Sequence, residues 1–387
     1  MKITGVRTRI YEAEMERWLG DANNPGGWKH FTAVLVNIDT DEDVSGMALS
    51  GVGAIPYIHG LVNGLLLGAD PRGVRGLWQK MNDEVFKGGN HGIMGGAVAA
   101  IDIALWDLKA RANNEPLWRT LGASEPRARA YASGLDMPLS DDDLRKFYLR
   151  MAAKGVNGGK LKVGLNREDD LRRIGIMRDA LATSGKTPEI MIDSNEYWSP
   201  KQAIAHIRYF EQHYDILWAE EPARRWDPDG LRKVSNSITA MVSTGENLDE
   251  LHRHKRLIEA HATDVIQPGA SLGITGIMQV ADLAYAFEIP VSMMNCPANY
   301  MAHVAAALPN HIHMEVLDAG RSAAMRVDNY IEDGWIILGD TPGLGIEYID
   351  EELEALTVDK PSPAPRSGRR IGATLYQVAA KPEELEH

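Results

Sequence analysis

The sequence of 387 residues has little cysteine, no long apolar stretch and a deficit of positive charge. With a single cysteine, Cys296, no disulfide can form within the chain, which fits a reducing compartment. No apolar stretch reaches the ~18 residues needed to cross a bilayer, and the start of the chain, Met1 to Val6, lacks the apolar core of a secretory signal. The net charge of −13 argues against nucleic acid or an anionic membrane as a partner. We therefore expect a cytoplasmic protein that binds neither.

The chain is long enough for two domains, or for one barrel with an added module. Its composition, 44% hydrophobic and 25% charged residues, is that of an ordinary globular protein. The last residues, Leu385-Glu386-His387, resemble the start of an expression tag and are left out of the fold prediction.

The first part of the chain, residues 1–125, is predicted to form an α+β domain. Residues 1–10 and 32–38 have the patterns of two strands that would pair antiparallel. Residues 18–30 between them are rich in glycine and asparagine, which break regular structure. This stretch ends in Trp28, Lys29 and His30. It can be a mobile lid over a site or a solvated hairpin loop, and the sequence does not decide between the two.

Helical spacing follows over residues 57–87 and again over residues 97–112. The Gly-rich run between them, residues 88–96, invites a phosphate-binding interpretation. It has neither the G-x-x-x-x-G-K-[ST] spacing nor the G-x-G-x-x-G spacing of phosphate loops. Entry into the second helix is therefore the favoured interpretation.

After a boundary near residues 122–126, short apolar strands alternate with amphipathic helices. Strands are predicted at 128–134, 158–163, 189–194, 216–220, 240–245, 264–268, 289–294 and 313–317. Helices in the later gaps are predicted at 168–183, 200–213, 249–260 and 275–287. This alternation is typical of a TIM-like (β/α)7β barrel, here over residues 126–325. Residues 326–387 again have a strand-like residue pattern, and we expect them to complete the N-terminal cap.

Two lysines end the second predicted barrel strand. Successive strand residues point to opposite faces, so Lys160 and Lys162 point the same way. Two neighbouring ammonium groups disfavour each other's charge, and we expect the pKa of at least one to fall. A lysine with a lowered pKa can act as a general base. By itself, the pair also fits one solvated lysine and one structural ion pair.

Three carboxylates at the ends of the next strands favour the catalytic interpretation. The tips at Lys162, Asp193, Glu220 and Glu246 follow one another at intervals of 31, 27 and 26 residues, the length of one βα unit. A barrel gathers all its strand C-termini at one face. The three acids would repel one another there unless a cation lies between them, and Mg²⁺ prefers such oxygen ligands. The sequence does not choose between Glu220 and Glu221.

A lysine base beside a bound metal predicts one class of chemistry. A metal that binds a substrate carboxylate stabilises the negative charge formed when the adjacent carbon loses a proton. The lysine would remove that proton and leave an enediolate. A small-molecule carboxylate is therefore the expected substrate.

In this order, these residues resemble the enolase superfamily, and within it the mandelate racemase and acid-sugar dehydratase group. The likeness spans nearly the whole chain, including the P-G-L-G-I-E stretch at residues 342–347. It implies one Mg²⁺ per subunit and a symmetric homo-oligomer. It also implies roles for six residues, with Lys160 and Lys162 as the lysine pair whose second member is the base, Glu315 as hydrogen-bond partner of the substrate carboxylate, and Asp193, Glu220 and Glu246 as metal ligands, with Asn195 beside the first.

The sequence departs from this group at the expected second acid–base site. Gly269 stands on the sixth strand where an Asp is usual, and the seventh strand, residues 289–294, contains no His. Racemisation needs proton exchange on both faces of the intermediate, whereas elimination can proceed with one base. Dehydration of a sugar acid is therefore the leading prediction. The residues considered as contacts of the substrate or as a second acid are Asn195, Asn295, Trp28, Lys29, His30, Tyr57 and His59.

Two alternatives stay open. A racemase, epimerase or cycloisomerase of a carboxylate substrate would need a second acid–base group that the sequence does not reveal. A barrel that binds a metal and a ligand without turnover is the alternative outside enzymes. Elsewhere, Cys296 is expected to be a small buried apolar residue. His303, His311 and His313 are expected to be structural, and Arg224 and Arg225 to face an anion or water.

Overall fold

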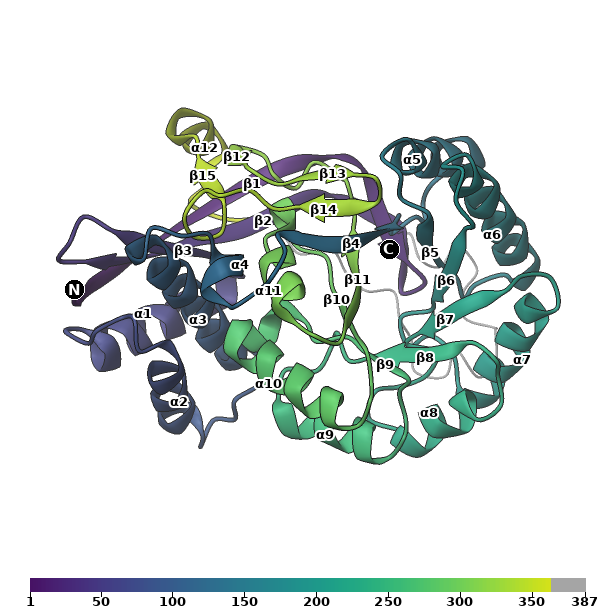
Figure 1. Ribbon diagram of the computed structural model, residues 1–387, viewed down its shortest axis with the longest axis horizontal. Coiled ribbons are helices and arrows are strands. Elements are labelled where there is room, and N and C mark those ends of the chain that lie inside the picture. Colours follow the sequence, from purple (N-terminus) through teal and green to yellow (C-terminus); the bar gives the residue numbers. More distant parts are fainter. Residues whose placement is uncertain (363–387) are drawn as a thin grey trace.

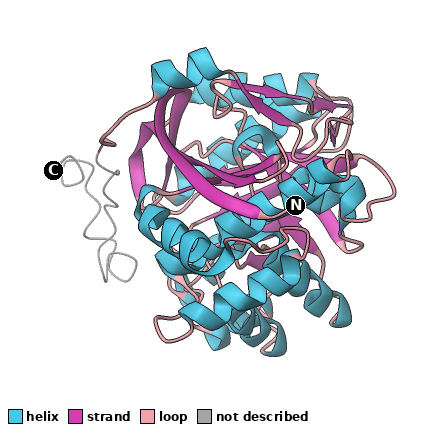
Figure 2. Cartoon of the chain, turned by 90° about the vertical axis from the view of Figure 1, so that its left-hand side faces the viewer, coloured by secondary structure: helices cyan, strands magenta, loops and turns pink. Residues whose placement is uncertain are grey.

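In a computed structural model of the chain, residues 1–362 are described, and the expected tag at 385–387 lies outside this part. Figure 1 shows a cap on one side of a ring of strands and helices, and Figure 2 shows the long cap strands from the side. No helix within residues 1–362 has both the length and the apolar character required to span a bilayer.

The cap is built on a three-stranded antiparallel sheet in the order β1-β2-β3. Its buried face is apolar because alternate β2 residues, Val34, Val36 and Ile38, point inward and are fully buried. The long helix α3 packs against β3. The cap elements are β1 (Ile3–Asp21), β2 (Asn24–Thr40), β3 (Ser45–Ser50), α1 (Ile55–Leu61), α2 (Val74–Val85), α3 (Gly92–Ala112) and α4 (Leu117–Thr120), with short helical turns at Val52–Ala54 and Val62–Leu66.

One local prediction for the cap is wrong, and a second is confirmed only in part. Residues 18–30 are not an irregular loop, because β1 and β2 continue through them and turn only between Asp21 and Asn24. The Asp21 carboxylate accepts backbone N–H groups of Asn23 (2.7 Å) and Asn24 (3.0 Å), which stabilises the turn. Residues 57–87 are not one helix but are interrupted between Leu66 and Val74. The Gly-rich run 88–96 does lead into α3.

Eight parallel strands form the barrel, and β11 pairs with β4 to close it. Every predicted strand is present, although the sixth and seventh are shorter than predicted. The strands are β4 (Arg127–Ser133), β5 (Gly158–Lys162), β6 (Glu189–Asp193), β7 (Ile216–Glu220), β8 (Met241–Thr244), β9 (Val265–Ile266), β10 (Val291–Met293) and β11 (His311–Val316). The helices between them are α5 (Asp141–Ala153), α6 (Arg167–Ala182), α7 (Pro200–Glu211), α8 (Pro228–Ser235), α9 (Leu251–Glu259), α10 (Gly273–Ala286) and α11 (Ala302–Ala307), with short turns at Ala270–Leu272 and Pro297–Asn299. The (β/α)7β barrel prediction is confirmed.

The strand register brings the charged tips to one level. Lys162 pairs with Asp193 across β5 and β6, and Asp193 pairs with Glu220 across β6 and β7. Side chains two residues earlier point to the same interior, where Met191 and Trp218 pack against Tyr131. The charged side chains therefore lie directly above a layer of packed apolar side chains in the barrel interior.

The C-terminal segment returns to the cap. Val358 donates its N–H to the carbonyl of Ile10 (3.0 Å), and Tyr11 forms a β-bridge with Thr357. The elements of the segment are β12 (Met325–Val327), β13 (Tyr330–Glu332), β14 (Trp335–Ile337), β15 (Ile346–Tyr348) and α12 (Asp350–Leu356). β14 also pairs antiparallel with β4 and so extends the barrel sheet. The exact boundaries at residues 125 and 325 stay a prediction.

Candidate active site

The two lysines lie inside a cluster of carboxylates at the C-terminal end of the barrel strands. Lys160 Nζ pairs with Glu220, with Glu315 Oε1 (3.1 Å) and with Asp193 Oδ2 (3.4 Å). Lys162 Nζ pairs with Asp193. Both lysine side chains are almost fully buried. The structure thus brings these five predicted residues into direct contact.

The expected fall in lysine pKa is wrong for this arrangement. Burial alone would lower the pKa of Lys162, and Lys160 acts in the same direction. The charge of Asp193 outweighs both and raises the pKa above its usual value. Burial is likewise outweighed at Lys160, where Glu220 and Glu315 raise the pKa. The prediction did not include the carboxylates, and their charge determines the direction in which the lysine pKa shifts.

Negative charge exceeds positive charge within the cluster. Burial raises the pKa of Glu220 and of Glu221, and the neighbouring acids raise both further. Glu315 behaves oppositely, because Lys160 overcomes the effect of burial and lowers its pKa to about 2. The two lysines contact three buried carboxylates, and the buried Glu221 and the half-buried Glu246 lie beside them. An additional cation would relieve this imbalance.

Glu220 and Glu221 point to different surroundings. Glu220 contacts Lys160 and also accepts from Gln267 Nε2 (2.6 Å) inside the barrel. Glu221 Oε1 accepts from Asn247 Nδ2 (2.8 Å), and the same amide donates to Glu246 Oε1 (3.1 Å). The second oxygen of Glu221, Oε2, is buried and has no hydrogen-bond partner in the described part of the chain. Either glutamate therefore remains available as an oxygen ligand.

The donor set fits a hard divalent cation, since it consists of carboxylate oxygens with an excess of negative charge. Within residues 1–362, no group of three or more His, Cys, Asp or Glu side chains is arranged to hold a metal ion directly. The ammonium groups of Lys160 and Lys162 contact the carboxylates instead. Metal binding would require these contacts to rearrange. The assignment of Asp193, Glu220 and Glu246 as ligands stays a prediction.

Two asparagines predicted as substrate contacts lie beside the cluster. Asn195 Oδ1 accepts from Lys162 Nζ (2.8 Å), and its carbonyl accepts from Asn23 Nδ2 (2.9 Å) at the turn of the cap hairpin. The turn of β1 and β2 therefore touches the barrel rim. Asn295 donates through Nδ2 to Glu315 Oε2 (2.6 Å).

The cap residues that were predicted to contact the substrate make other contacts or are exposed. Lys29 pairs with Glu14 (2.6 Å) on the neighbouring strand, and His59 contacts Thr8 (3.0 Å). Trp28 packs against the cluster of Met15, Leu19, Leu317 and Ala319. His30 and Tyr57 are exposed. The contacts of Lys29 and His59 lie within the cap sheet and its first helix, away from the lysine–carboxylate cluster.

The departure at Gly269 has a steric reason. A Cβ atom built there would lie 2.6 Å from the carbonyl oxygen of Glu246. The backbones after β8 and β9 approach too closely for any larger residue. The usual acid on the sixth strand is thus excluded by the same turn that presents Glu246.

Three residues of the site escaped the sequence reasoning. Asp136, just after β4, accepts the backbone N–H of Lys162 (3.0 Å) and the hydroxyl of Tyr148 (2.8 Å). Its place after a barrel strand was a usable signal. Gln267 contacts Glu220, and Arg321 donates to Asn295 Oδ1. No periodicity marks Arg321, which lies in the loop after β11.

The other singled-out residues have structural surroundings. Cys296 is buried and accepts the N–H of Met301 (3.2 Å). His303 is fully buried, whereas His313 pairs with Glu189 (2.9 Å). Arg225 pairs with Glu196 (2.9 Å).

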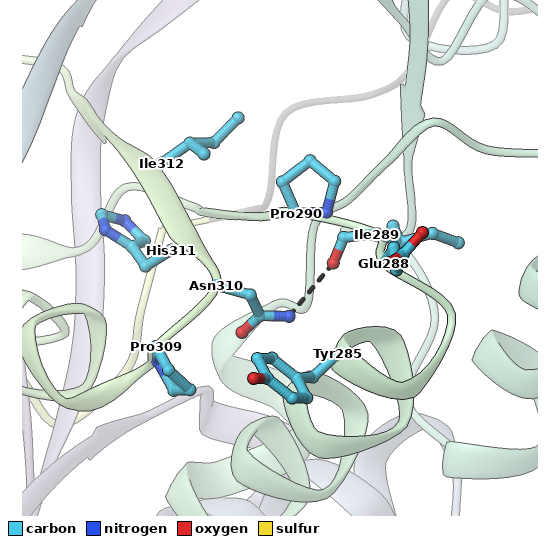
Figure 3. Close-up of a pocket in the computed structure, with 8 residues that line it drawn as sticks. All are labelled: Tyr285, Glu288, Ile289, Pro290, Pro309, Asn310, His311 and Ile312. Atoms are coloured by element: carbon cyan, nitrogen blue, oxygen red, sulfur yellow. Dashed lines mark hydrogen bonds between the residues drawn. The ribbon is translucent and has the colours of Figure 1, made fainter.

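Figure 3 shows the residues that line a pocket of about 470 Å³. This pocket lies at the opposite end of the barrel from the charged cluster. Pro290 precedes β10 and His311 begins β11, so the pocket is at the N-terminal ends of these strands. None of the predicted site residues lines it. The titratable groups gather at the other end, and we assign the chemistry there.

Comparison with known proteins agrees with the fold. Residues 143–353 match the family model "Enolase C-terminal domain-like". Residues 26–122 match the N-terminal domain model of the mandelate racemase and muconate lactonizing enzymes. Together these matches cover the barrel from α5 onward, without its first strand β4, and most of the cap.

Individual relatives carry different activities. The 3,6-anhydro-alpha-L-galactonate cycloisomerase of Streptomyces coelicolor is 29% identical over 92% of this chain and 99% of its own. The L-talarate/galactarate dehydratase of Salmonella typhimurium is 35% identical over 57% of this chain and 55% of its own. A crystal structure of L-talarate/galactarate dehydratase from Salmonella typhimurium LT2, liganded with Mg and L-lyxarohydroxamate, matches with a TM-score of 0.82 at 25% identity, covering 92% of this chain and 93% of that one.

Proposed function

This chain belongs to the mandelate racemase and muconate lactonizing enzyme family of the enolase superfamily, and we propose that it is a Mg²⁺-dependent sugar-acid dehydratase. One observation carries the proposal, namely the register that aligns Lys162, Asp193 and Glu220 on three adjacent strands. A base and oxygen ligands are thereby held side by side at the mouth of a barrel. The Mg-bound dehydratase structure supports both the metal and the substrate class.

Asp193, Glu220 and Glu246 would hold the ion, which when bound stabilises negative charge on the substrate carboxylate. Lys162 Nζ can take the proton from the carbon α to that carboxylate only as the neutral amine. A cation bound between the acids would replace the ammonium group at Asp193 and so remove the contact that raises the pKa of Lys162. Lys160 donates to the carboxylate, and Glu315, which contacts Lys160 (3.1 Å), can donate to the carboxylate only in its protonated form. Burial of the lysines excludes water from the ammonium groups and strengthens every charge interaction between them and the substrate.

Elimination completes the reaction. The C–H bond pair forms the new double bond, the β-carbon loses its hydroxyl, and that hydroxyl leaves as water with one proton. The resulting enol tautomerises to a 2-keto-3-deoxy acid. One base suffices for these steps, because Lys162 can give the proton that it removed to the departing hydroxyl on the same face of the substrate. The absence of an acid at Gly269 is thus compatible with dehydration.

Replacement of the proposed base tests the function. Sugar acids are incubated in deuterated water with Mg²⁺, and exchange at the α-carbon and loss of water are followed by NMR. We expect Lys162→Met to lower the exchange rate by about 10²- to 10⁴-fold, the usual contribution of a general base. Undiminished exchange would refute the assignment of Lys162.

Controls separate chemistry from folding. Lys146→Met changes an exposed lysine on α5 and should leave the rate unchanged. Thermal unfolding of each variant shows whether the fold survives, because removal of Lys162 leaves Asp193 with one lysine partner fewer in a buried site. Chelation of Mg²⁺ should abolish exchange in the wild-type enzyme and adding it back should restore it.

A cycloisomerase is the second candidate, because the 3,6-anhydro-alpha-L-galactonate cycloisomerase matches 92% of this chain. A product of unchanged mass would identify isomerisation, whereas loss of one water identifies dehydration. A binding protein without turnover is disfavoured by the intact lysine pair and carboxylates. As further parts of the proposal, the single cysteine supports a cytoplasmic location, and family resemblance supports a homo-oligomer.

A further inference from the structure

Arg321 is a half-buried cation without an acidic partner in residues 1–362. Its Nη1 donates to Asn295 Oδ1, and its guanidinium carbon lies 5.2 Å from the centre of the Phe31 ring. No Asp or Glu oxygen in this part of the chain lies within 4.0 Å of its nitrogens. Burial lowers the pKa of Arg321, although the nearby Cys296 and Glu315 partly oppose that effect.

Two other arginines near the rim pair with carboxylates, and a third contacts backbone oxygens. Arg225 pairs with Glu196 (2.9 Å), and Arg150 pairs with Asp318 (2.8 Å). Arg17 donates to the carbonyl of Leu317 and to other backbone oxygens. A guanidinium group has several N–H donors in a planar fork, and one amide oxygen satisfies only part of it. Arg321 therefore has guanidinium donors that are not paired with an acid in residues 1–362.

Arg321 lies beside the proposed active site. Asn295 joins it to Glu315, which contacts Lys160 (3.1 Å). The loop that carries Arg321 is fixed to the cap, since Glu16 donates its N–H to the carbonyl of Ala319 (3.1 Å). Arg321 is thus held between the cap hairpin and the barrel mouth, next to the residues that would bind the reacting carboxylate.

We propose that Arg321 binds a second carboxylate of the substrate, so that the enzyme acts on sugar diacids in preference to sugar monoacids. This inference rests on the proposed function and names its substrate class. The planar guanidinium matches a carboxylate through two parallel hydrogen bonds, which a neutral hydroxymethyl group cannot reproduce. A diacid would have one carboxylate near Lys162 and the other at Arg321.

A purely positioning role is the competing explanation. Arg321 would then hold Asn295, and through it Glu315, without touching the substrate. Such a role would affect diacids and monoacids equally, because both present the same reacting carboxylate. The ratio of kcat/KM for a matched pair therefore separates the two roles.

The matched pair is galactarate and D-galactonate, assayed with Mg²⁺ for the wild type, Arg321→Gln and Arg321→Lys. We expect the wild type to prefer the diacid. Loss of a charge-assisted hydrogen-bond pair should lower kcat/KM for galactarate by about 10- to 100-fold more than kcat/KM for D-galactonate. Arg321→Lys should recover part of the loss. Arg145→Gln, an exposed residue on α5, is the control.

Equal losses on both acids, or a wild-type preference for the monoacid, would overturn the inference. If neither acid exchanges its α-proton, the proposed function fails for both acids. The role of Arg321 is then tested by thermal unfolding, which measures how much each acid stabilises the protein. Stabilisation by galactarate that exceeds that by D-galactonate, and that Arg321→Gln abolishes, supports the second carboxylate site. Equal stabilisation by the two acids rejects it. Arg321→Lys serves these measurements if Arg321→Gln does not fold.

Discussion

His303 gives the protein a pH-dependent stability that can be worked out from its contacts. It is fully buried on α11, where the backbone N–H of Trp118 donates to Nδ1 (3.1 Å) and Nε2 faces the carbonyl of Leu344 (3.2 Å). A backbone N–H can only donate, so Nδ1 must be unprotonated and Nε2 carries the hydrogen. Protonation of Nδ1 would place its N–H against the N–H of Trp118, so that two donors would face each other without an acceptor. Burial therefore lowers the pKa of His303 to about 4.

The sign and size of the effect follow by linkage. Above pH 6.5 the imidazole is neutral in both states, and the stability is complete. As pH falls from 6.5 toward 4, the unfolded chain binds a proton that the folded chain does not, and stability is lost. At about 1.4 kcal/mol per pKa unit, the full loss is about 3 kcal/mol, of which about 2 kcal/mol is reached near pH 5.

Urea unfolding near pH 7 and near pH 5 measures this loss. We expect the wild type to lose about 2 kcal/mol more between these conditions than His303→Gln, which has no group to titrate there. Other titrating groups are common to both proteins and cancel in the comparison. His213→Gln removes an exposed histidine and should behave as the wild type. The same loss in His303→Gln as in the wild type would refute this account of His303.

Two further perturbations test the packing. In Gly46→Ala the new methyl group would collide with the carbonyl of Ala104 where β3 crosses α3, and we expect the free energy of unfolding to fall by about 1–3 kcal/mol. Gly60→Ala, where a Cβ meets nothing within 4 Å, should not destabilise; equal effects would contradict the close approach. Burial raises the pKa of Cys296 to about 12, so iodoacetamide at pH 8 should modify it only in urea. Rapid alkylation of the folded protein would show the thiol to be accessible.

The barrel was predictable because its signals are local. Each strand is a short apolar run, each connection has the length of one helix, and the interval between charged tips repeats at 31, 27 and 26 residues. Lys160 and Lys162 share a face by strand geometry alone. Closure of the sheet by pairing of β11 with β4 then follows from the number of strands.

The hairpin loop was one of the two interpretations of residues 18–30, but the strands that run through it were not predicted, because glycine and asparagine content measures local preference only. Cross-strand pairing over the length of β1 and β2 supplies hydrogen bonds that no single stretch reveals. The lysine pKa was mispredicted for a related reason. Its direction depends on Asp193, Glu220 and Glu315, which come from other strands.

The architecture, the end of the barrel at which charged side chains gather and their chemical types follow from the order of residues, since strand period and βα length are properties of neighbouring residues. The folded structure was needed to find which oxygen of each acid meets which amine, why Gly269 admits no side chain, and that Arg321 lies beside Asn295. Those facts depend on how loops from distant segments pack against one another. No periodicity along the chain records that packing.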